Sequence, residues 1–300
     1  MRRFGKTLIR PSLAAVLICL AAEISNAQAP SGQTPITTLR KAAEAGNADA
    51  QLQLGRAYWN GKGVPQDFTE ALRWYRRSAD GGNPLAQVAL GAAYYSGTGV
   101  KQDYGQSVIW FRKAADAGNA AAQSLLGYAY CNGLGVKRDY AEGVAWYRKA
   151  ADAGDVRAQF SLGLAYANGE VGPRDYAEAI RWYRKAADAG DAGAQVMLGH
   201  CYHFGFGVKQ DYAESVRLYR SAADAGNDSG QYNLGLAYAN GVGVPQNYVL
   251  AHMWVNLSAS HSSDDEREER AKVRDEIAQK MTPQQIAEAQ QMAVEWKSKK

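Results

Sequence analysis

One motif recurs every 36 residues through most of this 300-residue chain. A glycine lies at its centre, and the same position is occupied in turn by Gly55, Gly91, Gly127, Gly163, Gly199 and Gly235. Tyr58 and Gln51 recur with the same period through all six copies, without insertion. A fixed period of this length is typical of solenoids, in which each unit packs only on its neighbours. The repeat therefore constrains the fold more strongly than the composition does.

Each copy predicts two helices. In the first copy, helix A lies within "NADAQLQLGRAYWNG" and helix B within "DFTEALRWYRRSADGG". Ala50, Leu54 and Tyr58 are four residues apart and share one face of helix A. Gly55 lies in mid-helix, where glycine costs about 1 kcal/mol relative to alanine. Its return in every copy indicates that another helix approaches closely at this point.

Capping and turn residues mark the helix ends. Asp67 can cap helix B, and Glu70 three residues later completes a capping-box-like pair that recurs as "DYAE". Helix B ends at a glycine such as Gly82, and Asn83 can cap the next helix A. The connector "NGKGVPQDF" contains Gly-x-Gly, but a helix precedes it and Gln66 stands where a dinucleotide-binding loop has its third glycine. It predicts a turn rather than a phosphate-binding loop.

The two ends of the chain depart from the repeat. Residues 34–47 contain a lone helix B, and a charged helix from Glu266 to about Met281 and a helix begun by Thr282 follow the last repeat. Solenoids need atypical terminal units to cover their exposed faces, so we expect these helices to be caps, with partner docking as the alternative for the tail. We predict an all-α, right-handed α-solenoid of six 36-residue helix-turn-helix repeats with terminal capping helices. Its predicted parts are a signal peptide (1–27), a linker with a half-repeat helix (28–47), six repeats (48–261) and capping helices (262–300).

The first 27 residues have the layout of a secretory signal peptide. Four basic residues precede an apolar run, Ser12 to Ala22, that is too short to span a bilayer comfortably. Ser25 and Ala27 then form the small-x-small pattern that precedes a cleavage site. We expect cleavage after Ala27, a periplasmic or secreted protein, and no stable membrane insertion afterwards. An uncleaved membrane anchor is the alternative.

The charge balance excludes a nucleic-acid partner. The chain has 34 Lys and Arg and 30 Asp and Glu. The leader carries four of the basic groups and one acid, so cleavage would leave 30 basic (34 − 4) and 29 acidic (30 − 1) groups. Nucleic-acid binding needs a basic patch or stripe, and the mature sequence has neither.

Two cysteines remain after the leader, Cys131 and Cys201. They lie two repeats apart at similar positions of helix A, and packed helices are about 8–10 Å apart. A disulfide needs Cα atoms within about 7 Å, so we predict two unpaired, largely packed thiols.

The consensus "AxAQxxLGxAYxxGxGVxxDYxEAxxWYRKAAxAG" resembles that of the Sel-one-like repeat family, which is related to the tetratricopeptide repeats. The third copy carries it at Ala122, Gln123, Leu126, Gly127, Ala129, Tyr130, Gly133, Gly135, Val136, Asp139, Tyr140, Glu142, Trp146, Tyr147, Arg148, Lys149, Ala150, Ala151, Ala153 and Gly154. The fourth copy departs from it in "GEVGPRDY", which predicts a different turn. The sixth has Asn247 and Leu250 in place of the usual acids, which weakens its capping box.

The resemblance implies an adaptor that holds a partner on a concave surface. Many bacterial members are exported and take part in host contact, exopolysaccharide regulation or cell-envelope signalling. Some cysteine-rich exported relatives are linked to penicillin binding, so the resemblance also implies an alternative, an envelope hydrolase or cell-wall ligand binder with β-lactamase-like activity. A structural envelope spacer is a third reading.

The sequence shows no motif for catalysis. Neither Ser-x-x-Lys nor Lys-Thr-Gly occurs, and no Ser, His and Asp grouping stands out. His200 and His203 lie at i and i+3 on one helix, as two metal ligands could, but the sequence places no third ligand beside them. We predict no catalytic residue, no cofactor and no metal site.

The remaining candidate is a surface on the A helices. Positions aligned with 52, 56 and 59 vary between copies and share one face, whereas those aligned with 50, 51, 54, 55 and 58 barely vary. An exposed aromatic and apolar stripe there is unusual unless something binds it, although packing on the neighbouring helix A is the alternative. We therefore expect a protein or peptide partner in the concave groove. The predicted contacts are Arg56, Trp59, Tyr95, Tyr128, Phe160, His200, His203 and Tyr232.

Overall fold

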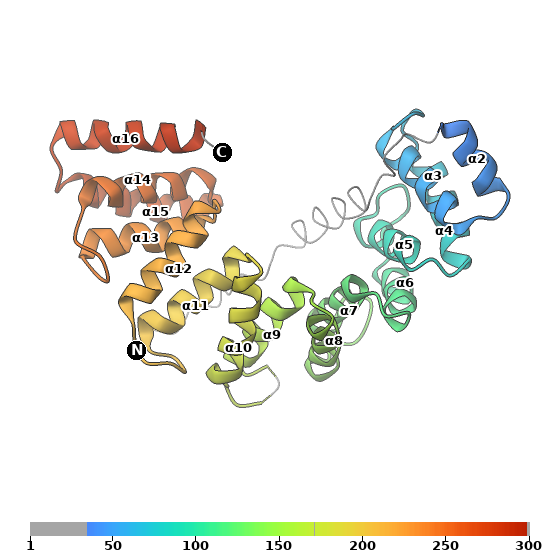
Figure 1. Ribbon diagram of the computed structural model, residues 1–300, viewed down its shortest axis with the longest axis horizontal. Helices are drawn as coiled ribbons and strands as arrows, with labels where there is room; N and C mark the ends of the chain where they lie inside the picture. Colours follow the sequence, from blue (N-terminus) through green and yellow to red (C-terminus); the bar gives the residue numbers. More distant parts are fainter. Residues whose placement is uncertain (1–34, 171, 299–300) are drawn as a thin grey trace. The chain divides into compact units, whose positions relative to one another are not determined.

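The computed structural model describes residues 35–170 and 172–298, which form fifteen helices and no strand (Figure 1). The chain divides between Ala153 and Gly154 into two compact units. The all-α repeat fold expected from the 36-residue period is confirmed. The predicted leader lies outside the described residues. Within these residues, no helix combines the length and the apolar character needed to cross a bilayer.

The first unit consists of a half repeat and three helix pairs. Its helices are α2 (Ile36–Glu44), α3 (Ala48–Asn60), α4 (Phe68–Asp80), α5 (Pro84–Ser96), α6 (Tyr104–Asp116), α7 (Ala120–Asn132) and α8 (Tyr140–Asp152). From α3 on, odd numbers are A helices and even numbers are B helices. Each helix packs on the next one along the chain, as Figure 1 shows in blue and green.

The second unit consists of three helix pairs and two further helices. These are α9 (Val156–Asn168), α10 (Tyr176–Asp188), α11 (Ala192–Phe204), α12 (Tyr212–Asp224), α13 (Asp228–Asn240), α14 (Tyr248–His261), α15 (Asp264–Ala278) and α16 (Pro283–Ser298). Its last two helices both pack on α14. They begin within a few residues of the positions predicted from the sequence.

The recurring glycine allows close packing of helix A on helix B. A Cβ built on Gly55 would lie 2.5 Å from Cδ1 of Tyr75, and one on Gly163 would lie 2.4 Å from Cδ1 of Tyr183. Real Cβ atoms do not approach a ring carbon so closely, and both tyrosine rings are buried. The close approach inferred from the repeated glycine is confirmed.

The connectors are turns, as predicted, but their capping differs from a capping box. Gly61 takes a left-handed conformation (φ 66°) after α3, and Asp67 Oδ1 accepts hydrogen bonds from the amides of Thr69 and Glu70. The reciprocal bond from Glu70 to the Asp67 amide is not made. That amide donates to Tyr58 O at 2.9 Å, so the Glu70 carboxylate instead pairs with Arg73.

Two hydrogen bonds recur between successive repeats within each unit, although Gln231 of the last repeat does not make the second of them. A helix-B arginine donates to the helix-A tyrosine of the next repeat, as from Arg76 Nη2 to Tyr94 Oη at 2.8 Å. A buried helix-A glutamine donates to a helix-B carbonyl, as from Gln87 Nε2 to Ala79 O at 3.2 Å. Because these bonds cross between repeats, they explain why the tyrosine and the glutamine recur with the period.

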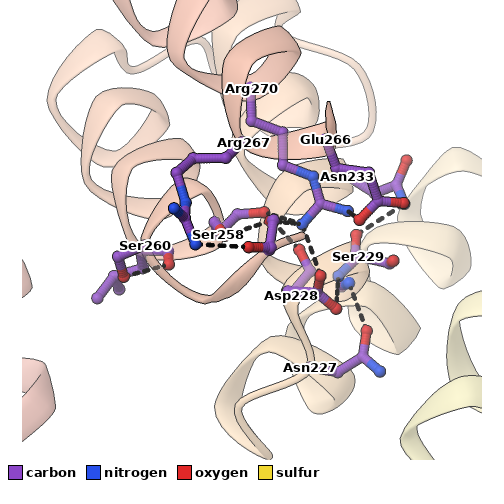
Figure 2. A network of polar contacts seen from close by, with 12 residues as sticks. Asn227, Asp228, Ser229, Asn233, Ser258, Ser260, Glu266, Arg267 and Arg270 are labelled. Atoms are coloured by element: carbon purple, nitrogen blue, oxygen red, sulfur yellow. Dashed lines mark hydrogen bonds and ion pairs between the residues drawn. The ribbon is translucent and has the colours of Figure 1, made fainter. Parts of the chain in front are cut away.

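A buried arginine holds α15 on the last repeat. Figure 2 shows Arg270 reaching from α15 toward the start of α13 and the end of α14. Its Nη1 lies within hydrogen-bonding distance of three oxygens, Asp228 Oδ2 at 2.8 Å, Ser258 Oγ at 2.7 Å and Ser262 Oγ at 2.5 Å, and shares its two hydrogens among them. Ala289 and Ala293 of α16 are buried in the cluster that contains Trp254 and Leu257. Both helices therefore cover the last repeat.

Candidate functional site

We define the helix-A face as the side chains aligned with Leu52, Arg56 and Trp59. The first of these positions is a packing position. Its members Leu52, Val88, Phe160 and Val196 are buried. The expected exposure of Phe160 is wrong, because its ring is only 7% exposed and packs in the cluster with Ile180 and Tyr183. A buried ring offers no surface to a partner.

Arg56 also differs from its expected exposure. Its side chain is buried, with 7% of its surface exposed, and burial lowers the pKa of its guanidinium. The ring of neighbouring Trp59 is half-buried and lies edge-on to Phe68, with centroids 4.9 Å apart. Part of Trp59 is therefore exposed at the surface of the first repeat, whereas Arg56 is buried.

Tyr95 and Tyr128 are brought together at the junction between α6 and α7. Both line one pocket, with Tyr104 at the start of α6. The Tyr95 and Tyr104 rings are 4.9 Å apart, and the Tyr104 hydroxyl accepts a hydrogen bond from Gln102 Nε2 at 3.1 Å. Burial, reinforced by Tyr128 and Tyr104, raises the pKa of the Tyr95 phenol far above its ordinary value. The phenol is therefore neutral at physiological pH.

His200 and His203 lie in an aromatic cluster of the second unit. The His200 ring lies edge-on to Tyr219, and the His203 ring lies edge-on to Phe204 and Tyr212. Burial lowers the pKa of both imidazoles; for His200 a hydrogen bond with Asn233 opposes this effect. Among the described residues, no three His, Cys, Asp or Glu side chains are grouped as metal ligands would be.

The remaining candidate, Tyr232, is half-buried beneath α15. The Arg270 guanidinium lies 5.5 Å from the centroid of the Tyr232 ring, and Val273 and Ile277 pack in the same cluster. α15 therefore covers Tyr232 as a further helix A would. The two cysteines are also buried, as predicted, and burial raises the pKa of the Cys201 thiol to about 11.

The Sel1 repeat model matches the sequence six times, at residues 48–83, 84–119, 120–155, 156–191, 192–227 and 228–263. The chain belongs to the Sel1 repeat family. The family and the six copies predicted from the sequence are confirmed. Sel1 repeats typically mediate protein interactions, and proteins built from them are generally non-enzymatic scaffolds. The search of curated proteins found no match.

Two solved structures are similar to this Sel1 repeat protein. One is c5321, a protective antigen present in uropathogenic Escherichia coli strains, with 30% identity and a TM-score of 0.81. The match covers 95% of this chain but only 61% of c5321, so the chain spans less than two thirds of that protein. The other is a Sel1 repeat protein from Oxalobacter formigenes, with 34% identity and a TM-score of 0.69, covering 76% of this chain and all of that one.

The structure adds helix-B residues to the candidate surface of this Sel1 repeat protein. Tyr104 and Ser107 of α6 line the pocket beside Tyr95, whereas all of the contacts predicted from the sequence lie on helix A. A signal was present, because Ser107 stands where Ala71 and Ala179 stand in other copies. Which of these positions border a pocket follows only from the packing of helix B on the next helix A.

Proposed function

We propose that this Sel1 repeat protein is an exported, non-enzymatic scaffold that binds a protein or peptide partner on its helix-A face, in cell-envelope signalling or regulation. The leader-like residues 1–27 support export, and the family supports the scaffold role.

The observation that carries the proposal is the group of three aromatic rings on the helix-A face of the first unit. Trp59, Tyr95 and Tyr128 are half-buried, and their positions vary between copies. Gly55 and Gln51, in contrast, occupy positions that the repeat uses for packing and for its junctions. Tryptophan and tyrosine are typical anchors of protein interfaces. Each of the three side chains therefore keeps part of its surface exposed, where a partner can contact it.

The test is affinity capture with the mature chain, followed by measurement of the purified complex. The alanine variants of Trp59, Tyr95 and Tyr128 should each weaken binding at least about tenfold, as anchors do. A matched control is Ile109→Ala, because Ile109 is 47% exposed but lies on α6, outside the helix-A face. Equal binding by the three variants and wild type would overturn the assignment of the face.

Two further measurements test the remaining parts of the proposal. The amino terminus of the protein recovered from cells should begin at Gln28, in the periplasm or the medium. Recovery of an uncleaved chain from the membrane would contradict export as a soluble scaffold. Hydrolysis of a β-lactam or muropeptide panel by the pure chain would contradict the non-enzymatic role.

A further inference from the structure

A buried histidine, His252, lies on α14, the helix on which α15 packs. Its side chain is 3% exposed, and its Nδ1 has no hydrogen-bond partner among the described residues. The aligned positions of the other five repeats are all apolar: Leu72, Val108, Val144, Ile180 and Val216. The last repeat therefore places a titratable group where the other repeats place an apolar side chain.

Two contacts on either side of His252 show that it faces α15. Tyr248, His252 and Asn256 are four residues apart and share one face of α14. Lys280, just after α15, lies 5.6 Å from the centroid of the Tyr248 ring. Farther along this face, Arg274 Nη1 of α15 donates to Asn256 Oδ1 at 3.4 Å. Because α15 runs between these two contacts, it covers His252.

The helix α15 brings a pair of opposite charges to His252. These are Arg274 and Asp275, and Nη2 of the arginine donates to Oδ1 of the aspartate at 2.7 Å. The arginine therefore offsets much of the negative charge, and Lys280 adds a positive charge one helical turn away. Burial, reinforced by Arg274 and opposed by Asp275, lowers the pKa of the His252 imidazole. His252 is therefore neutral at pH 7 while α15 is docked.

The other helices that pack on α14 do not compensate a charge on His252. Asp228 is the charged residue of α13, and its carboxylate is already bonded to Arg270. The other titratable groups of α13 are the phenols of Tyr232 and Tyr238. The helix α16 packs on the opposite side of α14, where it contacts the cluster that contains Trp254 and Leu257. An imidazolium ion beneath α15 would therefore lose its hydration without gaining a free acid as its partner.

We propose that His252 makes the docking of α15 sensitive to pH, so that protonation of the imidazole loosens this helix from the last repeat. When α15 moves away, His252 becomes hydrated and takes up a proton at about pH 6.5, as a free imidazole does. Docking is therefore unaffected well above that pH. It weakens as the pH falls below that value, until the lowered pKa of the docked state is reached. Because α15 covers Tyr232, acidification would also uncover this part of the helix-A face.

The test is amide hydrogen exchange of the full-length mature protein from about pH 7.5 to about pH 5, with each rate divided by the intrinsic rate at the same pH. Exchange in α15 should become at least about tenfold faster after this correction, because a free imidazole titrates within the interval. The helices of the first unit provide the reference. An unchanged rate in α15 would overturn the proposal. Equal acceleration in every helix of the second unit would also overturn it, because the whole unit would then be unfolding.

Three variants assign the effect to His252. His252→Leu copies Leu72 of the first repeat, and His252→Gln keeps a polar side chain that does not titrate. Both should make the corrected exchange of α15 independent of pH in this interval. His261→Gln is the matched control, because His261 also lies on α14, and it should keep the wild-type pH dependence. A pH dependence that persists in both His252 variants, or disappears in His261→Gln, would overturn the proposal.

This pH switch goes beyond the proposed scaffold function and does not depend on it, because the docking of α15 can be measured without a partner. Exchange of α15 that is independent of pH, together with weaker capture by the Trp59, Tyr95 and Tyr128 variants, would overturn the switch and leave the scaffold function standing. Exchange that depends on His252, together with equal capture by those variants and wild type, would support the switch and overturn the assignment of the helix-A face.

Discussion

The α6/α7 junction of the first unit and the α10/α11 junction of the second have the same framework but different interiors. In both, a buried helix-A glutamine donates to a helix-B carbonyl, from Gln123 to Ala115 at 3.2 Å and from Gln195 to Ala187 at 3.4 Å. In both, an aromatic ring packs on the first tyrosine of helix B. At α6 that ring is Tyr95, from the preceding helix A.

At α10 the ring on the first tyrosine comes instead from the following connector. Phe206 stacks on Tyr176 with centroids 5.1 Å apart, and it stands where Leu134 lines the pocket beside Tyr104. Constant positions therefore set the spacing of the helices, and variable positions set what lies between them. One repeat can place small side chains, such as Val108 and Ala129, where its equivalent places the larger Ile180 and Cys201.

The shared framework can be tested first, because its failure has the largest expected effect. A Cβ at Gly127 would lie 2.9 Å from Gly143 O, and one at Gly199 would lie 2.6 Å from Cε1 of Tyr219. Gly127→Ala and Gly199→Ala should each reduce the local stability by about 3 kcal/mol, measured by hydrogen exchange. Gly105→Ala is the control, because its added Cβ would meet only Asp103 Oδ1, at 3.2 Å, and alanine stands at the aligned positions 141, 177 and 213. A loss at only one of the two sites would show that the framework is not shared.

The packing at the α10/α11 junction can be tested by removing one methyl group. Ile180→Val should destabilise the second unit by about 1 kcal/mol, because the removed Cδ1 methyl, which lies close to Gly207, leaves a void in the buried cluster that contains Cys201. Amide exchange should increase in α10 and α11 but not in the first unit. An unchanged exchange rate would mean that the site collapses around the smaller side chain.

The pocket at the α6/α7 junction can be tested by adding one methyl group. Val108→Ile should stabilise the first unit by about 0.5–1 kcal/mol, since the added methyl enters existing space. Its thermal midpoint should rise when measured at a slow scan rate. A lower midpoint would show overpacking and would place the open space elsewhere in the junction.

The smallest effect concerns the caps of the two junctions. Asn119 caps α7, whereas Asp191 caps α11, and burial raises the pKa of the Asp191 carboxyl. The folded state therefore disfavours the ionised carboxylate, and this penalty is complete above the raised pKa and fades as the pH falls. Asp191→Asn should stabilise the second unit by less than about 1 kcal/mol at pH 7.

The pH dependence provides the check for the caps. The gain from Asp191→Asn should vanish near pH 3, where the carboxyl is protonated in both states. Asp155→Asn is the control, because Asp155 is paired with Arg157 at 3.2 Å and its replacement removes that ion pair. If Asp155→Asn raised the stability as much as Asp191→Asn does, or if the gain at Asp191 did not depend on pH, burial of the Asp191 carboxylate would not be the cause of the gain.

Much of the fold could be predicted from the sequence, because each residue that the packing requires recurs in up to six copies. The 36-residue period predicted the helix pairs, and the recurrence of Gly55 predicted the close helix contact that Tyr75 makes in the structure. The capping box was wrong, since whether the Asp67 amide is available depends on its contact with Tyr58. The C-terminal cap was expected from position alone, but nothing in the sequence singled out Arg270 as its buried contact.

The candidate site shows the same division between local and tertiary information. Variation between copies predicts that Tyr95 and Tyr128 are not required by the framework, and the structure places both at one pocket. Variation between copies could not show that Phe160 is buried, because the exposure of a side chain depends on the neighbouring repeat. The sequence by itself determined the repeat, its helices and their spacing, since these rest on local periodicity. Only the tertiary structure decided which variable side chains meet across a junction, and whether they fill it.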